Sequence, residues 1–148
     1  MAEIHTLIIA CGNRLRGDDA VGPAAADVVE QWRLPGVHVL IVHQLTPELI
    51  DEMKLVERVL FVDAAISTGE YPFVICAVAP RKSRRALGHH ETPENLLALL
   101  GELEGRATEA WLLKISACSF EHVDVLTAKA EDNVKAALAW IGAWVACR

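Results

Sequence analysis

The chain lacks the patterns that mark several common functional classes. Its 148 residues carry a formal net charge of -6, whereas general nucleic-acid-binding proteins usually present a strongly basic face. The four cysteines are scattered, with no C-x-x-C pair and no spacing typical of a zinc ribbon or a disulfide framework. The composition therefore argues against a nucleic-acid partner and fits reduced thiols in a cytosol.

Signals for export and for membrane insertion are also missing. The N-terminus has no basic region followed by an apolar stretch and a small-residue cleavage site. The apolar run Ala136–Cys147 is too short to span a bilayer and is expected to be the buried end of a helix. Since no internal repeat or low-complexity linker is present, we expect a single domain over residues 1–148, located in the cytoplasm and without a membrane partner.

Apolar stretches that alternate with helical patterns predict an α/β fold. Asp63 and the strand that begins at Phe73 are separated by too few residues for a helical crossover, which predicts one antiparallel pairing. The expected architecture is a three-layer α/β/α fold with a five-stranded, mostly parallel twisted sheet. Strands are predicted at Thr6–Cys11, Val37–Val42, Val59–Val62, Phe73–Val78 and Ala110–Ile115, and helices from Val21, from Thr46-Pro47-Glu48, from Thr92-Pro93-Glu94 and from about Thr127.

The loop from Gly12 to Gly22 carries two adjacent carboxylates, Asp18 and Asp19, between the first strand and the first helix. In open α/β sheets ligands bind in the crevice at the carboxyl ends of the strands, so this loop is a candidate site. The loop contains neither a dinucleotide nor a P-loop motif, and an acidic pair repels phosphate, so a cation is the expected ligand. Alternatively, one of the two carboxylates caps the helix that follows.

Asp63 closes the apolar strand Val59–Val62 and is expected to face the same crevice, unless it is only a turn residue. His89 and His90 lie in the loop before the third helix and could supply an imidazole. Two carboxylates and one imidazole, with open positions for water or substrate, suit a borderline divalent ion such as zinc or nickel.

Other side chains at the strand ends have two interpretations each. His43 follows the second strand and is a candidate substrate contact, while Asn13 turns the loop or binds a substrate main chain. Cys11 is either a nucleophile or, more commonly for such a thiol, a small buried side chain. Trp140 and Trp144 lie four residues apart on the last helix and either widen the core contact or form a patch for a partner.

Over nearly its whole length the chain resembles the hydrogenase maturation proteases, the endopeptidases that trim the C-terminus of the large subunit of nickel–iron hydrogenases. The likeness rests on Gly12-Asn13 with Asp18-Asp19 and Gly22, on Asp63 after Leu60-Phe61-Val62, on His89 ahead of Pro93, and on Phe120-Glu121 before the last helix.

The resemblance implies a metal-binding and catalytic triad of Asp19, Asp63 and His89, although the adjacent His90 leaves the choice of histidine open. Asn13, Asp18, His43 and His90 are then the expected substrate contacts. It also implies that the metal is nickel, supplied by the hydrogenase large-subunit precursor, and that zinc or cadmium can take its place. The expected function is removal of the C-terminal peptide of the precursor after nickel insertion.

Two other interpretations compete with this one. A receiver domain also has an acidic pair after its first strand, an aspartate at the end of its third and a lysine near its fifth, here Lys114. The residues between the first strand and the acidic pair, together with the antiparallel strand, argue against that fold. A non-catalytic nickel chaperone or inspection protein would use the same ligands without cutting, and the sequence does not separate it from a protease.

Overall fold

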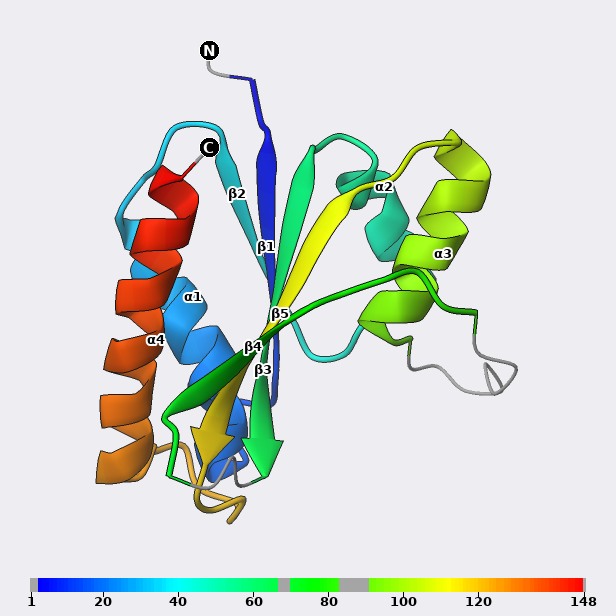
Figure 1. Cartoon of the computed structure of the whole chain (residues 1–148). Coiled ribbons are helices and arrows are strands. Elements are labelled where there is room, and N and C mark those ends of the chain that lie inside the picture. The colour runs from blue at the N-terminus through cyan, green and yellow to red at the C-terminus, as the bar shows by residue number, and fades with distance from the viewer. Residues whose placement is uncertain (1–2, 67–69, 83–90, 148) are drawn as a thin grey trace.

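The computed structural model describes residues 3–66, 70–82 and 91–147, which form one five-stranded sheet with helices on both faces (Figure 1). The strand order is β2-β1-β3-β5-β4, and β4 is antiparallel to β5 while the other pairs are parallel. This confirms the expected three-layer architecture, and an antiparallel edge strand separates it from a receiver domain. The strands are β1 (Thr6–Cys11), β2 (Val37–Val42), β3 (Arg58–Ile66), β4 (Phe73–Ala77) and β5 (Glu109–Ala117).

The helices divide between the two faces of the sheet. In Figure 1, α1 and α4 cover one face and α2 and α3 cover the other. The helices are α1 (Val21–Gln31), α2 (Ile50–Met53), α3 (Pro93–Glu104) and α4 (Ala128–Ala146), with short 3-10 turns η1 (Gly17–Ala20) and η2 (Pro47–Leu49) before the first two. None of the helices in the described ranges is long and apolar enough to cross a membrane.

The central strands are continuously apolar because helices bury them on both faces. Ile8 and Ile9 are adjacent on β1 and both have no exposed surface. Since side chains alternate along a strand, Ile8 joins the core beneath α1 and α4, and Ile9 joins the core beneath α2 and α3. The sheet therefore separates two cores, and the second supplies most of the apolar lining of the candidate site, including Ile9, Phe61 and Leu112.

Helix capping follows the sequence in part. The side chain of Thr92 accepts a hydrogen bond from the amide of Asn95 at the start of α3, and Thr127 accepts one from Ala130 at the start of α4. The Thr-Pro-Glu pattern at Thr46 predicts a capping threonine there too, and this prediction is wrong, because the Thr46 side chain caps no helix amide and hydrogen-bonds with Glu48 instead.

The last turn of α4 is held by a buried guanidinium. Arg58 donates hydrogen bonds to the carbonyls of Trp144 (3.1 Å), Val145 (3.0 Å) and Cys147 (2.9 Å), which a helix end otherwise leaves without partners. It also lies 4.1 Å from the centre of the Trp144 ring, which stacks on Trp140. Both tryptophans pack against the core, so the structure supports the core interpretation of this pair.

Candidate functional site

The carboxyl ends of β1 and β3 form one edge of the candidate site. Their pairing ends at Ala10 and Val62, so Asp63 is the first β3 residue without a β1 partner. β3 nevertheless continues to Ile66, because β5 pairs with it as far as Ala117. The prediction that Asp63 ends its strand is therefore wrong. Asp63 still faces a crevice, since β1 stops beside it.

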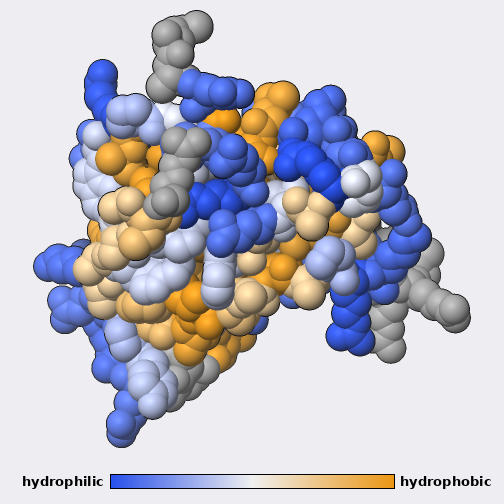
Figure 2. Space-filling model, turned by 45° about the horizontal axis from the view of Figure 1, so that its top comes forward, coloured by the Kyte–Doolittle hydropathy of each residue, from blue (hydrophilic) through white to orange (hydrophobic). Residues whose placement is uncertain are grey.

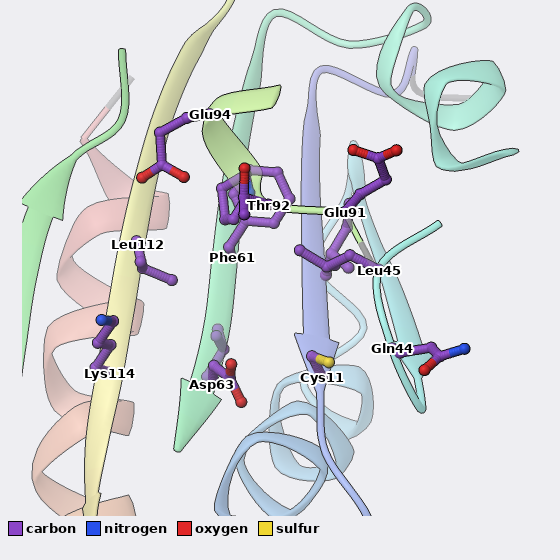
Figure 3. A pocket seen from close by; sticks show the side chains of 13 residues that line it. Cys11, Gln44, Leu45, Phe61, Asp63, Glu91, Thr92, Glu94, Leu112 and Lys114 are labelled. Carbon is purple, nitrogen blue, oxygen red and sulfur yellow. The ribbon is translucent and has the colours of Figure 1, made fainter. Parts of the chain in front are cut away.

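A cavity of about 400 Å³ opens at this edge, on the sheet face that α2 and α3 cover. Polar side chains cross it in the order of the strands, with Lys114 from β5, Asp63 from β3 and Cys11 from β1, while the start of α3 contributes residues at the other end (Figure 3). The cavity therefore joins the sheet edge to a helix N-terminus. Its lining residues are Ile9, Cys11, Gln44, Leu45, Phe61, Val62, Asp63, Glu91, Thr92, Pro93, Glu94, Leu112 and Lys114.

The carboxylate of Asp63 is half-buried in this cavity. Burial raises its pKa above the ordinary value, and repulsion from Asp19 adds to the effect. A hydrogen bond from the amide of Ala64 (2.8 Å) and attraction from Lys114 oppose the shift without cancelling it. Asp63 thus lies in a site where a neighbouring cation would be strongly favoured.

Asp19 approaches the cavity from the loop after β1. Its carboxylate accepts a hydrogen bond from the amide of Asn13 (2.9 Å), which folds the loop back on itself. This close approach requires glycine at position 12, because a Cβ there would overlap the carbonyl of Asp19 and lie 2.9 Å from the Cδ atom of Pro23. The loop therefore brings Asp19 beside Asp63 and Cys11, whose pKa values both respond to its charge.

Asp18, the other member of the pair, points away from the cavity and has no exposed surface. It accepts hydrogen bonds from the amides of Cys118 (2.7 Å), Ser119 (3.0 Å) and Thr127 (2.8 Å) and from the Thr127 hydroxyl (2.9 Å). Burial alone would raise the pKa of Asp18, but these hydrogen bonds hold it below the ordinary value.

The structure therefore corrects two expectations for the acidic pair. Asp18 has no free surface for a substrate and instead joins the β1–α1 loop to the β5–α4 connection. Neither carboxylate caps α1, because neither accepts a capping hydrogen bond there. Gly17 permits the junction, since its φ of +53° suits glycine and a Cβ would lie 2.8 Å from the carbonyl of Ser119.

The thiol of Cys11 lines the cavity and donates to the carbonyl of His43 (3.3 Å). Burial raises its pKa to about 11, with repulsion from Asp63 and Asp19 adding to the shift. The thiol is therefore protonated at neutral pH, which favours the non-nucleophilic interpretation of this residue.

The structure places the other predicted substrate contacts differently. His43 is exposed and does not line the cavity, whereas its neighbour Gln44 lines it. The Asn13 side chain accepts from the amide of Leu15 (2.9 Å), as expected of a residue that turns the loop. His89 and His90 lie outside the described residues, although Glu91, the first described residue after them, lines the cavity.

Within residues 3–66, 70–82 and 91–147, no three His, Cys, Asp or Glu side chains form a group that could hold a metal ion. The triad of Asp19, Asp63 and His89 includes a residue outside these ranges, so it stays a prediction. What the structure does bring together is the two carboxylates, Asp19 from the loop after β1 and Asp63 from β3.

Glu91 and Glu94 were not identified from the sequence as site residues, and Lys114 was considered only for the receiver-domain alternative. Glu91 and Glu94 flank the capping Thr92 and line the cavity, and Lys114 lies directly across from Asp63 in the β3–β5 register. The predicted start of α3 was a usable signal for the glutamates, because a helix that begins at the carboxyl edge of a sheet places its first turn over the crevice.

Comparisons of this structure with solved ones identify a group of peptidases, although no family model and no curated protein sequence matches the chain. The hydrogenase 2 maturation peptidase of a Thaumarchaeota archaeon has a TM-score of 0.71 and 21% identity, covering 97% of this chain and 99% of that one. The hydrogenase maturating endopeptidase HybD of E. coli has a TM-score of 0.71 and 22% identity, covering 93% of this chain and 90% of that one. The NiFe hydrogenase maturation protease HycI of Thermococcus kodakarensis has a TM-score of 0.71 and 21% identity, with coverages of 93% and 89%. Across both full lengths, the chain has the fold of the hydrogenase maturation peptidases.

Proposed function

We propose that this protein is a cytoplasmic endopeptidase that removes the C-terminal peptide of a nickel–iron hydrogenase large-subunit precursor after nickel insertion. The observation that carries the proposal is the pairing of Asp19 with Asp63 at the carboxyl edge of the sheet, in a chain that shares 97% of its length with a hydrogenase maturation peptidase. Both carboxylates lie near the carboxyl ends of β1 and β3, where ligands of α/β proteins bind.

The donor set fits a divalent cation presented by the substrate. Asp19 and Asp63 repel each other, and burial already penalises the charge on Asp63, so a cation between them would relieve both effects. His89 is the proposed third ligand, in the segment that ends where Glu91 enters the cavity. Carboxylate and imidazole ligands suit nickel, and we expect zinc or cadmium to replace it.

The remaining cavity residues suit hydrolysis by water. Cys11 keeps its proton at neutral pH, so the proposed reaction has no thiol nucleophile. A carboxylate of the pair would orient the attacking water, and the cation would lower the free energy of the developing oxyanion. Lys114, on the opposite side of Asp63 from Cys11, adds a positive charge to the same cavity (Figure 3).

The test is to incubate the purified protein with nickel-loaded precursor and, separately, with nickel-free precursor, and to measure the C-terminal mass of each product. We expect loss of a defined peptide from the loaded form alone. Nickel-dependent binding without any change in mass would contradict the proposal and support a non-catalytic nickel chaperone or inspection protein.

Replacement of either carboxylate gives the matching prediction for the site. Asp19→Asn and Asp63→Asn should each reduce the processing rate at least about 100-fold, because each removes a charge that faces the cation. Asp27→Asn is the matched control, since Asp27 forms only an exposed ion pair with Arg14 (2.7 Å). Normal processing by both site variants would rule out this assignment of the carboxylates.

A further inference from the structure

The outer edge of β4 is a strand edge that nothing else in the described chain pairs with. β4 is the last strand of the sheet and is hydrogen-bonded to β5 alone. In Figure 1 it crosses in front of the other strands, and α4, which contacts it, stands to its left. Exposed strand edges present unpaired amides and carbonyls, and a further strand can add to them.

The β4–β5 register shows which backbone groups point outward. The amide of Val78 donates to the carbonyl of Ala110 (2.9 Å), and the carbonyl of Pro72 accepts from the amide of Ser116 (2.9 Å). Because backbone groups alternate in direction along an antiparallel strand, Val74 and Cys76 also direct theirs to β5. The amides and carbonyls that point away from the sheet are those of Phe73, Ile75 and Ala77.

The residues of β4 itself carry none of the side-chain features that usually prevent strand addition. Phe73–Ala77 contains no charged residue, no proline and no glycine, and every residue in it is apolar. Natural edge strands are commonly protected by lysine, proline, a bulge or a covering segment. Figure 2 shows a hydrophobic band across the same side of the molecule, so the edge is suited to an apolar, extended partner.

The uncovered face of β4 continues into the cavity. Val74 and Cys76 lie directly opposite Lys114 and Leu112 of β5, and side chains of such pairs share a face of the sheet. Both β5 residues line the cavity, and Val74 is 37% exposed beside them. An extended peptide paired with the β4 edge would therefore lie on the same surface as the opening of the cavity.

We propose that an extended segment of the precursor adds to β4 as a sixth strand, parallel or antiparallel, and so holds the tail for cleavage. This inference rests on the proposed function, which supplies a substrate that is a flexible chain end. A sixth strand would lie three strand spacings from β3, or roughly 14 Å. The paired segment would then be separated from the scissile bond by about four extended residues.

The first test is hydrogen exchange of the backbone amides, measured by NMR on the wild-type protein with a synthetic peptide that spans the cleavage site of the precursor. We expect the amides of Phe73, Ile75 and Ala77 to exchange at least about tenfold more slowly with saturating peptide. The amides of Val74 and Cys76, already bonded to β5, should not change. Uniform protection, or no protection at millimolar peptide, would overturn the proposal.

The second test uses a substitution that removes one outward amide. Ala77→Pro deletes the amide that would bond to the added strand while keeping the pairing to β5, since Ala77 directs its backbone outward. We expect the KM for the nickel-loaded precursor to rise at least about tenfold with kcat within twofold. Ala77→Val is the matched control, because it retains the amide and should behave as wild type.

A second variant covers the case in which Ala77→Pro does not fold. Val74→Lys places a charge on the exposed side of the edge and should also raise KM. Leu103→Lys, at an apolar position near the end of α3 that is 65% exposed against 37% for Val74, should not. Unchanged KM in a folded Ala77→Pro or in Val74→Lys would reject the inference while the proposed function stands. No cleavage by wild type would reject the proposed function instead.

Measuring the mass in solution tests whether the β4 edge binds a second copy of this chain instead of the precursor. A wild-type dimer by light scattering that Ala77→Pro converts to a monomer would assign the β4 edge to self-association and overturn the proposal. We expect wild type and Ala77→Pro to have the same mass in solution.

Discussion

At the scale of single residues, two adjacent aspartates have different environments. Asp19 is close enough to Asp63 for its charge to raise the pKa of that carboxyl, whereas Asp18 is buried among four donors from the other end of the chain. A sequence alone shows two equivalent acids, because the partners of Asp18 are 100 or more residues away. The difference between the structural carboxylate of Asp18 and the proposed ligand Asp19 is a result of the three-dimensional fold.

Asp18→Asn should destabilise the protein by about 2 to 4 kcal/mol, because an amide provides one acceptor where the carboxylate serves four donors. Chemical denaturation at pH 7 measures the difference. Asp27→Asn, which breaks only an exposed ion pair, should lose about 1 kcal/mol or less.

The same carboxylate predicts a pH dependence. The folded-state pKa of Asp18 is lowered, so its contribution to stability is fully present above the ordinary range near pH 4 and is lost as the pH falls through the lower folded value. The free energy of unfolding of wild type should therefore fall more steeply than that of Asp18→Asn below about pH 4. Parallel curves for the two proteins would contradict this assignment.

Cys11 predicts a difference in thiol reactivity. With a pKa raised to about 11, it should react with iodoacetamide at pH 8 about 10- to 100-fold more slowly than exposed Cys118 or Cys147, as measured by peptide mass mapping. Asp63→Asn should accelerate Cys11 and leave the other two unchanged, because it removes one negative charge beside the thiol. Equal rates at all three thiols would show that Cys11 is not shielded in this way.

At the scale of elements, α4 is fixed at both ends by side chains from distant segments. Thr127 at its start is bonded to Asp18, and the carbonyls of its last turn accept from Arg58 on β3. Arg58→Lys should destabilise the protein by about 2 kcal/mol, since a lysine cannot reproduce the planar set of donors. Hydrogen exchange should show faster opening of the last turn of α4, while Arg14→Lys on the surface should leave it unchanged.

The strands and helices themselves could largely be predicted, because each has a local signal. Apolar runs bounded by turn residues identified all five strands, and the short link before Phe73 identified the antiparallel one. The end of β3 could not be predicted, because Asp63 is polar and only the pairing with β5 extends the strand to Ile66. The hydroxyl of Thr46 bonds to Glu48 rather than to a helix amide, a choice that the capping pattern does not contain.

For the candidate site, sequence could supply the residue types but only part of their arrangement. The proximity of Asp19 and Asp63 was predictable, since Asp19 follows β1 and Asp63 lies in β3 just beyond the end of its pairing with β1. The role of Asp18, the protonated state of Cys11 and the place of Lys114 across from Asp63 depend on contacts between distant segments. Such contacts appear only once the register of the sheet is known.

At the scale of the whole molecule, the sheet places neighbouring residues of one strand in two different cores, as Ile8 and Ile9 show. Ile8→Val and Ile9→Val remove the same methylene group from adjacent, fully buried positions on opposite faces of β1, and each should lower stability by about 1 kcal/mol. Only Ile9 lines the cavity, so only Ile9→Val should change the KM for the precursor, by a few-fold. Equal effects on KM would show that both cores influence the site.

The bonds of Asp18 also determine when the site can form during synthesis. The loop that carries Asp19 is anchored through its neighbour to residue 127, which is 109 positions further along the chain. At about 5 to 20 residues per second, a ribosome needs roughly 5 to 20 s to add those residues. For that time the nascent protein has its first strand and both acids but no anchor for the loop between them and α1, so we expect the proposed site to form only once synthesis has reached the start of the last helix.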